Sequence, residues 1–254
     1  MRQLTKGLWV VVGALTLVKG ILSGNPPLVK NAPTYFINGP AKNFRDAVRS
    51  EGFIIPKEDA HWENPVTSEC ECRSLCWTYT QCLGSSTHQE SGKVICRVTA
   101  KPPHNLTLVD NAGGTFSFWR SSIDYALYRV FEDFLYLVPK ATMNYDDSRA
   151  YCERIPGHRL GMFKDISLLR VLSRIHMTTG MELWIDLHNS PDGPAWGDGV
   201  LLDKDLALTV FRTLVYINSD TNPIRVKMQN ELDDNPAKNI RGFVCQANLG
   251  GLHW

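Results

Sequence analysis

The sequence lacks an excess of charge of either sign. Its 254 residues include 27 lysines and arginines against 26 aspartates and glutamates, so the formal net charge is only +1. Proteins that bind nucleic acid through phosphate contacts carry a basic stretch or patch, and none is visible in the sequence. An acidic tail is absent as well. The sequence therefore predicts no nucleic-acid partner.

The sequence also lacks the short motifs of common enzyme classes. It has no Gly-x-Ser-x-Gly elbow, no His-Glu-x-x-His pair, no phosphate-binding loop and no dinucleotide fingerprint. Its seven histidines are scattered, and no two have the spacing that places metal ligands on one helix face. We expect a protein that is not an enzyme and that acts by binding.

No apolar run reaches the roughly 20 residues that a transmembrane helix needs. The longest, residues 7–18, follows two basic residues and precedes the small residues Gly20 and Gly24. This layout is typical of a signal peptide and predicts removal of residues 1–24. The alternative, an uncleaved membrane anchor, is disfavoured because twelve apolar residues are too short for a bilayer. Removing three basic residues and no acid leaves 24 against 26, a formal charge of −2.

Secretion sets two expectations about covalent modification. An oxidising compartment favours disulfides over free thiols, so most of the seven cysteines should be bonded. The sequon Asn105-Leu106-Thr107 is a candidate N-glycosylation site at Asn105. We expect an extracellular glycoprotein.

The cysteines are unevenly distributed. Five lie between Cys70 and Cys96, whereas Cys152 and Cys245 stand far apart. This asymmetry predicts two domains, with a boundary near residues 121–124.

Local patterns in the first half predict a helix beside a small sheet. Ser68 and Glu71 have the spacing of a capping box, which predicts a helix starting there. Cys72 and Cys76 would then lie on one helix face, and residues 94–98 form a strand candidate. The competing interpretation of the cysteine cluster is a zinc site. The two-cysteine knuckle spacing of common zinc modules is missing, which disfavours it.

The first half resembles a PAN/apple domain over about residues 34–120. The resemblance rests on the spacing Cys72-x3-Cys76-x5-Cys82, on Cys96, and on the aromatic strand 114–118. It implies a small disulfide-rich α+β domain in which Cys72 pairs with Cys96 and Cys76 with Cys82.

Cys70 is then the odd cysteine. It could bridge two chains, pair with another protein, or replace Cys72 in its bond. We expect the first, a disulfide-linked homodimer.

Local patterns in the second half predict two helices and several strands. Asn144 can cap a helix that runs through Cys152. A second helix begins at Asp165, with an apolar stripe. The stripe consists of Ile166, Leu169, Leu172 and Ile175. Strands are expected at residues 134–138, 183–187 and 242–245, and residues from 188 to Asn222 should be loop.

The second half resembles a C-type lectin domain over residues 126–248. Five motifs occur in the family's order: Asp147-x2-Ala150-x-Cys152, Arg159-Leu160-Gly161-Met162, Trp184-Ile185-Asp186-Leu187, Trp196-Gly197-Asp198-Gly199 and Phe243-Val244-Cys245. Asp186 stands where the family has glycine. The resemblance implies an α+β fold with two helices, a long loop region, antiparallel strands and a Cys152–Cys245 bridge. The two tryptophans should be core residues.

The resemblance also implies a calcium-assisted sugar site. Asp234 lies eleven residues before Cys245, where the family has an Asn-Asp pair, so Asp233 and Asp234 are the candidate calcium ligands. Asn222 is the remaining member of the second ligand motif, in which Ile224 replaces the other oxygen-bearing residue. We therefore expect at most a weak calcium site. The alternative is that the two aspartates form a solvated turn.

Two functional hypotheses follow. The first is a secreted lectin that binds glycans through calcium and serves recognition or adhesion. The family resemblance suggests an invertebrate protein of innate immunity. The second is a calcium-independent module that binds extracellular proteins or matrix. The altered ligand motif favours the second hypothesis, whereas Asp233 and Asp234 favour the first.

Overall fold

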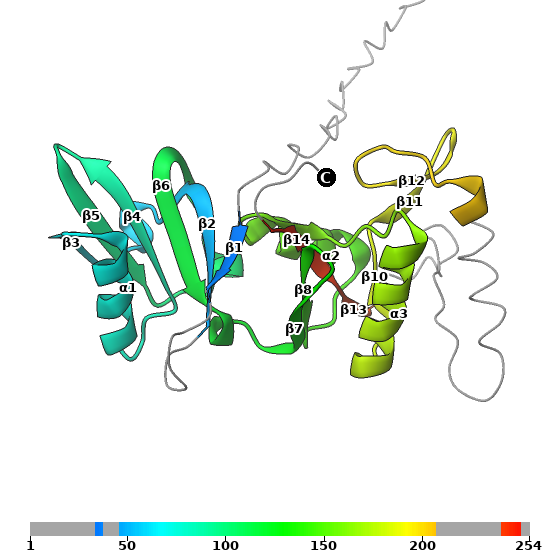
Figure 1. Ribbon diagram of the computed structural model, residues 1–254, viewed down its shortest axis with the longest axis horizontal. Coiled ribbons are helices and arrows are strands. Elements are labelled where there is room, and N and C mark those ends of the chain that lie inside the picture. The colour runs from blue at the N-terminus through cyan, green and yellow to red at the C-terminus, as the bar shows by residue number, and fades with distance from the viewer. Residues whose placement is uncertain (1–33, 38–45, 207–239, 250–254) are drawn as a thin grey trace, which may run out of the picture.

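The computed structural model of the chain describes residues 34–37, 46–206 and 240–249. Figure 1 shows an elongated α+β molecule, with the N-terminal sheet and α1 at one end and α3 at the other. The expected signal peptide and the candidate ligands Asn222, Asp233 and Asp234 lie outside the described residues. Within those residues, no helix has the length and apolar character needed to cross a membrane.

The N-terminal half is an antiparallel six-stranded sheet with one helix. The strands lie in the order β1-β2-β6-β4-β5-β3. Their bounds are β1 Thr34–Ile37, β2 Ala47–Ile54, β3 Trp62–Val66, β4 Gly84–Glu90, β5 Lys93–Thr99 and β6 Val109–Trp119. Short 3-10 turns lie at Lys57–Asp59, Pro103–Asn105 and Arg120–Ser122. The last of these turns separates the sheet from the C-terminal half.

Helix α1 (Glu69–Thr78) begins where the capping pattern predicts. Ser68 Oγ accepts a hydrogen bond from the Glu71 backbone N–H at 3.2 Å, which satisfies one otherwise unbonded donor of the first turn. In a standard capping box the Glu71 carboxylate would accept from the backbone N–H of the cap residue, Ser68. Here it accepts instead from the backbone N–H of Thr67, one residue earlier, at 2.6 Å. Cys72 and Cys76 are both buried, so the predicted shared face is confirmed.

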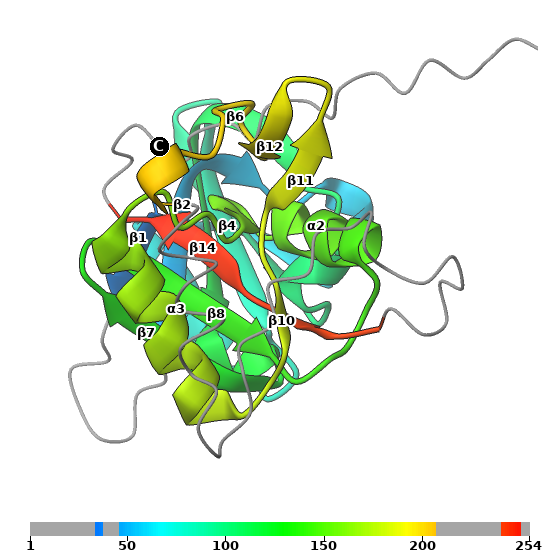
Figure 2. The ribbon, with the colours of Figure 1, turned by 90° about the vertical axis from the view of Figure 1, so that its right-hand side faces the viewer.

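The C-terminal half is built on a four-stranded antiparallel sheet in the order β7-β8-β14-β9. Its strands are β7 Tyr125–Phe131, β8 Phe134–Pro139, β9 His158–Leu160 and β14 Cys245–Asn248. Figure 2 shows β14 crossing the centre of this half, although it comes from the end of the chain. A separate parallel pair joins β10 (Leu183–Trp184) to β13 (Gly242–Phe243).

Helices α2 (Tyr145–Arg154) and α3 (Ile166–Thr179) start at the predicted caps. Asn144 Oδ1 accepts from the Asp147 N–H at 2.8 Å, and Asp165 Oδ1 accepts from the Leu168 N–H at 2.9 Å. One member of the predicted stripe on α3 is wrong, since Ile166 is half exposed, whereas Leu169 is partly buried and packs against the core. The buried face consists of Leu168, Val171, Leu172 and Ile175.

Two further expectations need correction. The strand predicted at 183–187 ends after Trp184, because the chain turns at Asp186. The stretch expected to be loop contains an antiparallel hairpin, β11 (Leu187–Ser190) with β12 (Gly193–Trp196). The hairpin turns at Gly193, whose φ of +119° favours glycine.

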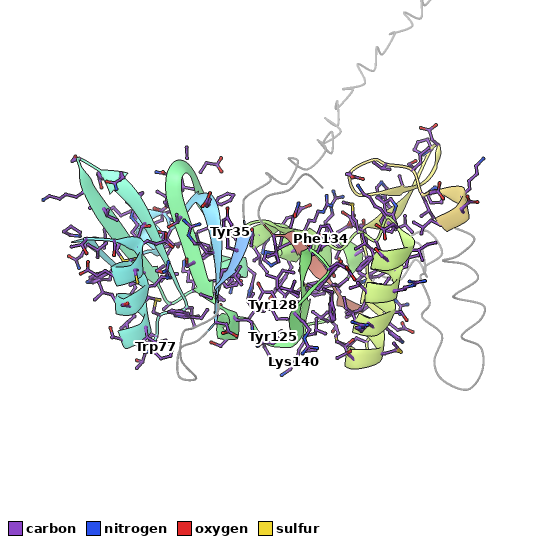
Figure 3. All side chains as sticks on the ribbon, viewed as in Figure 1. Tyr35, Trp77, Tyr125, Tyr128, Phe134 and Lys140 are labelled. Atoms are coloured by element: carbon purple, nitrogen blue, oxygen red, sulfur yellow. A yellow bond between two sulfur atoms is a disulfide. The ribbon has the colours of Figure 1, made fainter. Side chains whose placement is uncertain are left out.

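One hydrophobic cluster crosses the junction of the two halves. It joins Phe116 and Phe118 of the N-terminal sheet to Leu135 and Leu137 of β8. Figure 3 shows Tyr128 at this junction. Its hydroxyl is 3.2 Å from the Nε2 atom of the fully buried His158. The halves therefore share a core rather than touching at their surfaces.

Three disulfides connect the cysteines. They join Cys72 to Cys96, Cys76 to Cys82 and Cys152 to Cys245. These are the pairs that the two family resemblances imply. Cys70 is exposed and is the free cysteine of the part of the chain described here.

Candidate binding site

The described chain ends at Leu206 and resumes at Ile240, on either side of the segment that carries the candidate calcium ligands. Asn222, Asp233 and Asp234 all belong to that segment, which lies outside the described residues. The structure does describe the two stems from which this segment leaves the fold.

The outgoing stem is fixed to the β11–β12 hairpin. The Leu202 N–H donates to Pro194 O at 2.8 Å, and the side chain of Leu206 is buried in the core. Asp203 Oδ1 accepts from the Leu206 N–H at 2.9 Å. Figure 2 shows the hairpin at the upper edge of the C-terminal half.

The returning stem is fixed through Arg241. Its backbone N–H and C=O pair with Met143 at 2.9 and 2.8 Å. Its guanidinium forms an ion pair with Glu182 and lies 5.6 Å above the ring of Trp184. Trp184 in turn donates from Nε1 to Met143 O at 3.0 Å. The chain thus re-enters the fold at a place set by several contacts.

A buried carboxylate lies beneath the hairpin. Asp186 is 3% exposed, and its Oδ1 atom accepts a hydrogen bond from the Tyr145 hydroxyl at 2.7 Å. Burial and the neighbouring carboxylate raise the pKa of Tyr145, which keeps its hydroxyl protonated and able to donate. A Cβ atom at Gly197 would overlap the Asp186 carboxylate, so this position admits only glycine while Asp186 is in place.

The Trp196-Gly197-Asp198-Gly199 turn follows the second strand of the hairpin, and the Gly199 N–H donates to Trp196 O at 2.8 Å. Trp184 and Trp196 are 4% and 2% exposed, so the expectation that both are core residues is confirmed. Asp198 pairs with Lys164. Burial acts to raise the pKa of Asp198, but hydrogen bonds from Lys164 and from the Val200 N–H lower it on balance.

Sequence reasoning missed the bond between Tyr145 and Asp186. The available signal was the aspartate at the place where the resembling family has glycine, since a buried carboxylate needs a donor. Nothing local pointed to Tyr145, which lies 41 residues earlier.

No group of three histidine, cysteine, aspartate or glutamate side chains that could hold a metal ion occurs in residues 34–37, 46–206 or 240–249. The two remaining candidate positions of modification lie on the surface. Cys70 is exposed on the first turn of α1. Asn105 is exposed at the end of a 3-10 turn, with Thr107 also exposed.

No protein-family model matches the chain, and no curated protein sequence matches it. Two solved structures of human lithostathine are similar to part of it. The first has 13% sequence identity and a TM-score of 0.33, and the match covers 48% of this chain and 96% of that one. The second has 15% identity and a TM-score of 0.32, with 48% and 88% covered.

Proposed function

We propose that the chain is a secreted C-type lectin-like protein that binds glycans. The observation that carries this proposal is the pair of anchored stems, Leu206 and Arg241, which bracket the segment containing Asp233 and Asp234. A rigid scaffold that presents a polar segment is the usual arrangement of a recognition site. The five sequence motifs and the Cys152–Cys245 bond support the same assignment.

Calcium is the proposed cofactor. Asp233 and Asp234 supply carboxylate oxygens, and Asn222 supplies an amide oxygen. Vicinal hydroxyls of a sugar would complete the coordination shell. Because Ile224 removes one further ligand, the site binds calcium weakly.

A glycan array tests the proposal. The secreted chain is applied in millimolar calcium and again in EDTA, together with the double variant Asp233→Asn/Asp234→Asn. We expect binding that EDTA and the double variant both abolish. The matched control is Asp133→Asn/Asp192→Asn, which removes two exposed carboxylates on other turns and should bind normally.

The second candidate function is calcium-independent binding of extracellular proteins or matrix. The observation that favours it is Ile224, which leaves the second ligand motif incomplete. If the chain binds no glycan on the array and is retained on immobilised matrix proteins in EDTA, the second candidate function replaces the first.

The N-terminal half is proposed to be a PAN/apple-like domain covering residues 34–120. Its support is a helix held to the sheet by Cys72–Cys96 and closed by Cys76–Cys82. Three disulfides suit an oxidising compartment, which supports secretion after cleavage of residues 1–24 and glycosylation at Asn105.

A further inference from the structure

A second candidate site lies in the N-terminal half, between the C-terminal end of α1 and strands β3 and β5. A pocket of about 300 Å³ opens there, and side chains from all three elements line it. They are His61, Trp62, Leu75, Tyr79 and Val98. Figure 1 shows these elements at the end of the molecule opposite α3, and Figure 3 labels Trp77, two residues before Tyr79.

The pocket has one aromatic wall. The rings of His61 and Tyr79 stack with centroids 5.0 Å apart and planes 18° apart. Leu75 lies one helical turn before Tyr79, whose N–H donates to Leu75 O at 3.1 Å. Val98 is 3% exposed and forms part of the lining. These surfaces present apolar carbon to whatever enters.

A chain of hydrogen bonds runs through two lining residues, His61 and Tyr79, to Gln81, which adjoins the lining; these three side chains are called the rim. The Tyr79 hydroxyl donates to Gln81 Oε1 at 3.0 Å and lies 2.6 Å from His61 Nε2. Since a hydroxyl has one proton, His61 Nε2–H donates to Tyr79 in this arrangement. His61 Nδ1 is then an acceptor, and the Gln81 amide nitrogen is a donor. The rim therefore offers both kinds of hydrogen-bonding group.

Covalent and backbone contacts hold the rim in place. The Cys76–Cys82 disulfide closes the turn that carries both Tyr79 and Gln81. The His61 N–H donates to Val98 O at 2.8 Å, which fixes the other side. A site that is already ordered loses less conformational entropy when a ligand binds.

The lining carries no aspartate, glutamate, lysine or arginine. The charged pair Lys101–Asp59, on the neighbouring turn, has an N–O separation of 2.5 Å, so its charges offset one another. An anionic ligand normally requires arginine or lysine donors. The ligand that fits this lining is uncharged.

We propose that this pocket binds one neutral sugar ring, independently of calcium. A pyranose presents a face of C–H groups, which matches the aromatic wall, and hydroxyls that both donate and accept, which match the rim. An apolar peptide side chain would match the aromatic wall but would offer no hydrogen bond to His61 Nδ1 or to the Gln81 amide nitrogen, which the contacts within the rim leave available. The volume lies at the lower end of the small-molecule range, about 300–1,000 Å³, which limits the occupant to one ring.

This proposal deepens the proposed function and rests on it, because it adds a second glycan contact to a glycan-binding chain. The pocket lies in the N-terminal half, at the end opposite α3 (Figure 1), whereas the stem that ends at Leu206 belongs to the C-terminal half, so one chain could bridge two glycans. Linked weak sites gain strength through effective concentration.

The experiment is an NMR titration of the isotope-labelled secreted chain in EDTA. The probes are methyl glycosides of neutral hexoses, fucose and N-acetylhexosamines. We expect saturable shifts of the Trp62 indole N–H and the Leu75 and Val98 methyl signals with at least one probe. Tyr79→Phe removes one hydrogen bond and should weaken that binding about 5- to 10-fold. The control Tyr35→Phe alters a tyrosine on β1 and should leave it unchanged.

Three results of this titration would overturn the proposal, and a fourth comes from the glycan array. One is the absence of shifts across the whole panel, and another is an equal affinity for wild type, Tyr79→Phe and His61→Ala. The third is a preference for blocked phenylalanine or leucine peptides at the same signals, which would assign the pocket to a polypeptide. Glycan binding that EDTA abolishes and Tyr79→Phe leaves intact would reject the pocket while retaining the proposed function.

Discussion

At the scale of single residues, the molecule depends on buried polar groups that hydrogen-bond inside the protein. His158 is completely buried at the junction of the halves, and burial lowers its pKa to about 4, against an opposing hydrogen bond with Pro156. Its Nδ1 atom lies 3.0 Å from Pro156 O, so Nδ1–H donates there and Nε2 accepts from Tyr128. The folded chain therefore holds this ring neutral.

Stability should fall in acid because of His158. In the unfolded chain the pKa of this histidine is about 6.5. Between that pH and about 4 the ring is protonated in the unfolded state but neutral in the folded state, which favours unfolding. The contribution of the neutral His158 ring to the free energy of unfolding is fully present above about pH 6.5 and is lost as the pH falls through about 4. Urea unfolding should show a loss of about 2 kcal/mol from this group between pH 7.5 and pH 5.

The variant His158→Gln isolates this effect, since glutamine keeps a donor and an acceptor but does not titrate in this range. Its unfolding free energy should depend less on pH than that of the wild type, by about that 2 kcal/mol. Equal pH dependence of the two proteins would contradict the assignment.

The buried Asp186 gives a second prediction. Tyr145→Phe removes the hydroxyl that donates to its carboxylate, which should lower the free energy of unfolding by about 1–3 kcal/mol. Thermal or urea unfolding measures the change. Tyr35→Phe, at a partly exposed tyrosine, serves as the control and should change stability by less than about 0.5 kcal/mol. An unchanged Tyr145→Phe protein would mean that Asp186 finds another donor.

At the scale of elements, the residues at which helices begin could be predicted from the sequence, whereas the face that a helix buries could not. Asn144 and Asp165 bond backbone groups three residues away, so their signals are local. On α3 both the predicted stripe and the observed buried face satisfy a helical period. The choice between them depends on β7, β8 and the hairpin, which pack against the helix from distant parts of the sequence.

The sequence does contain a local signal for the β11–β12 hairpin. The sequence Pro191-Asp192-Gly193 is a turn pattern between two strands, and Ser190 Oγ donates to Gly193 O at 2.7 Å. The candidate calcium ligands stay a prediction: Asp233 and Asp234 rest on the spacing from Cys245, and Asn222 rests on the remnant of the second ligand motif.

The disulfides give a prediction at the same scale. Replacing both cysteines of Cys152–Cys245 by alanine releases a closed loop with a sequence separation of 93. Because the unfolded chain gains entropy, the free energy of unfolding should fall by about 4.5 kcal/mol. The same change at Cys76–Cys82 opens a loop of six and should cost about 2 kcal/mol. Urea unfolding of the two double variants tests the order, and a reversed order would contradict the chain-entropy account.

At the scale of the whole molecule, one hydrophobic cluster has members in both halves of the chain. The cluster that contains Phe116 and Leu135 crosses the expected domain boundary. The uneven distribution of the cysteines predicts a boundary near residues 121–124, whereas packing between aromatic residues of distant strands leaves no local signal in the sequence.

Cys70 predicts a covalent dimer. It is exposed on α1, and the other six cysteines are bonded within the chain. A non-reducing gel of the secreted protein should show twice the monomer mass, and a reducing gel should show the monomer. Cys70→Ser is the matched variant and should run as a monomer in both gels. A monomer of the wild type under non-reducing conditions would rule out the dimer.

The most direct test of the central claim is a calorimetric titration of calcium into the secreted chain. The account predicts saturable calcium binding in the range of extracellular modules, with Kd of about 10⁻⁴–10⁻³ M. That binding should be lost in Asp233→Asn/Asp234→Asn and retained in Asp133→Asn/Asp192→Asn. No saturable heat in the wild type, or equal heats in both double variants, would contradict a calcium site in the segment between Leu206 and Ile240.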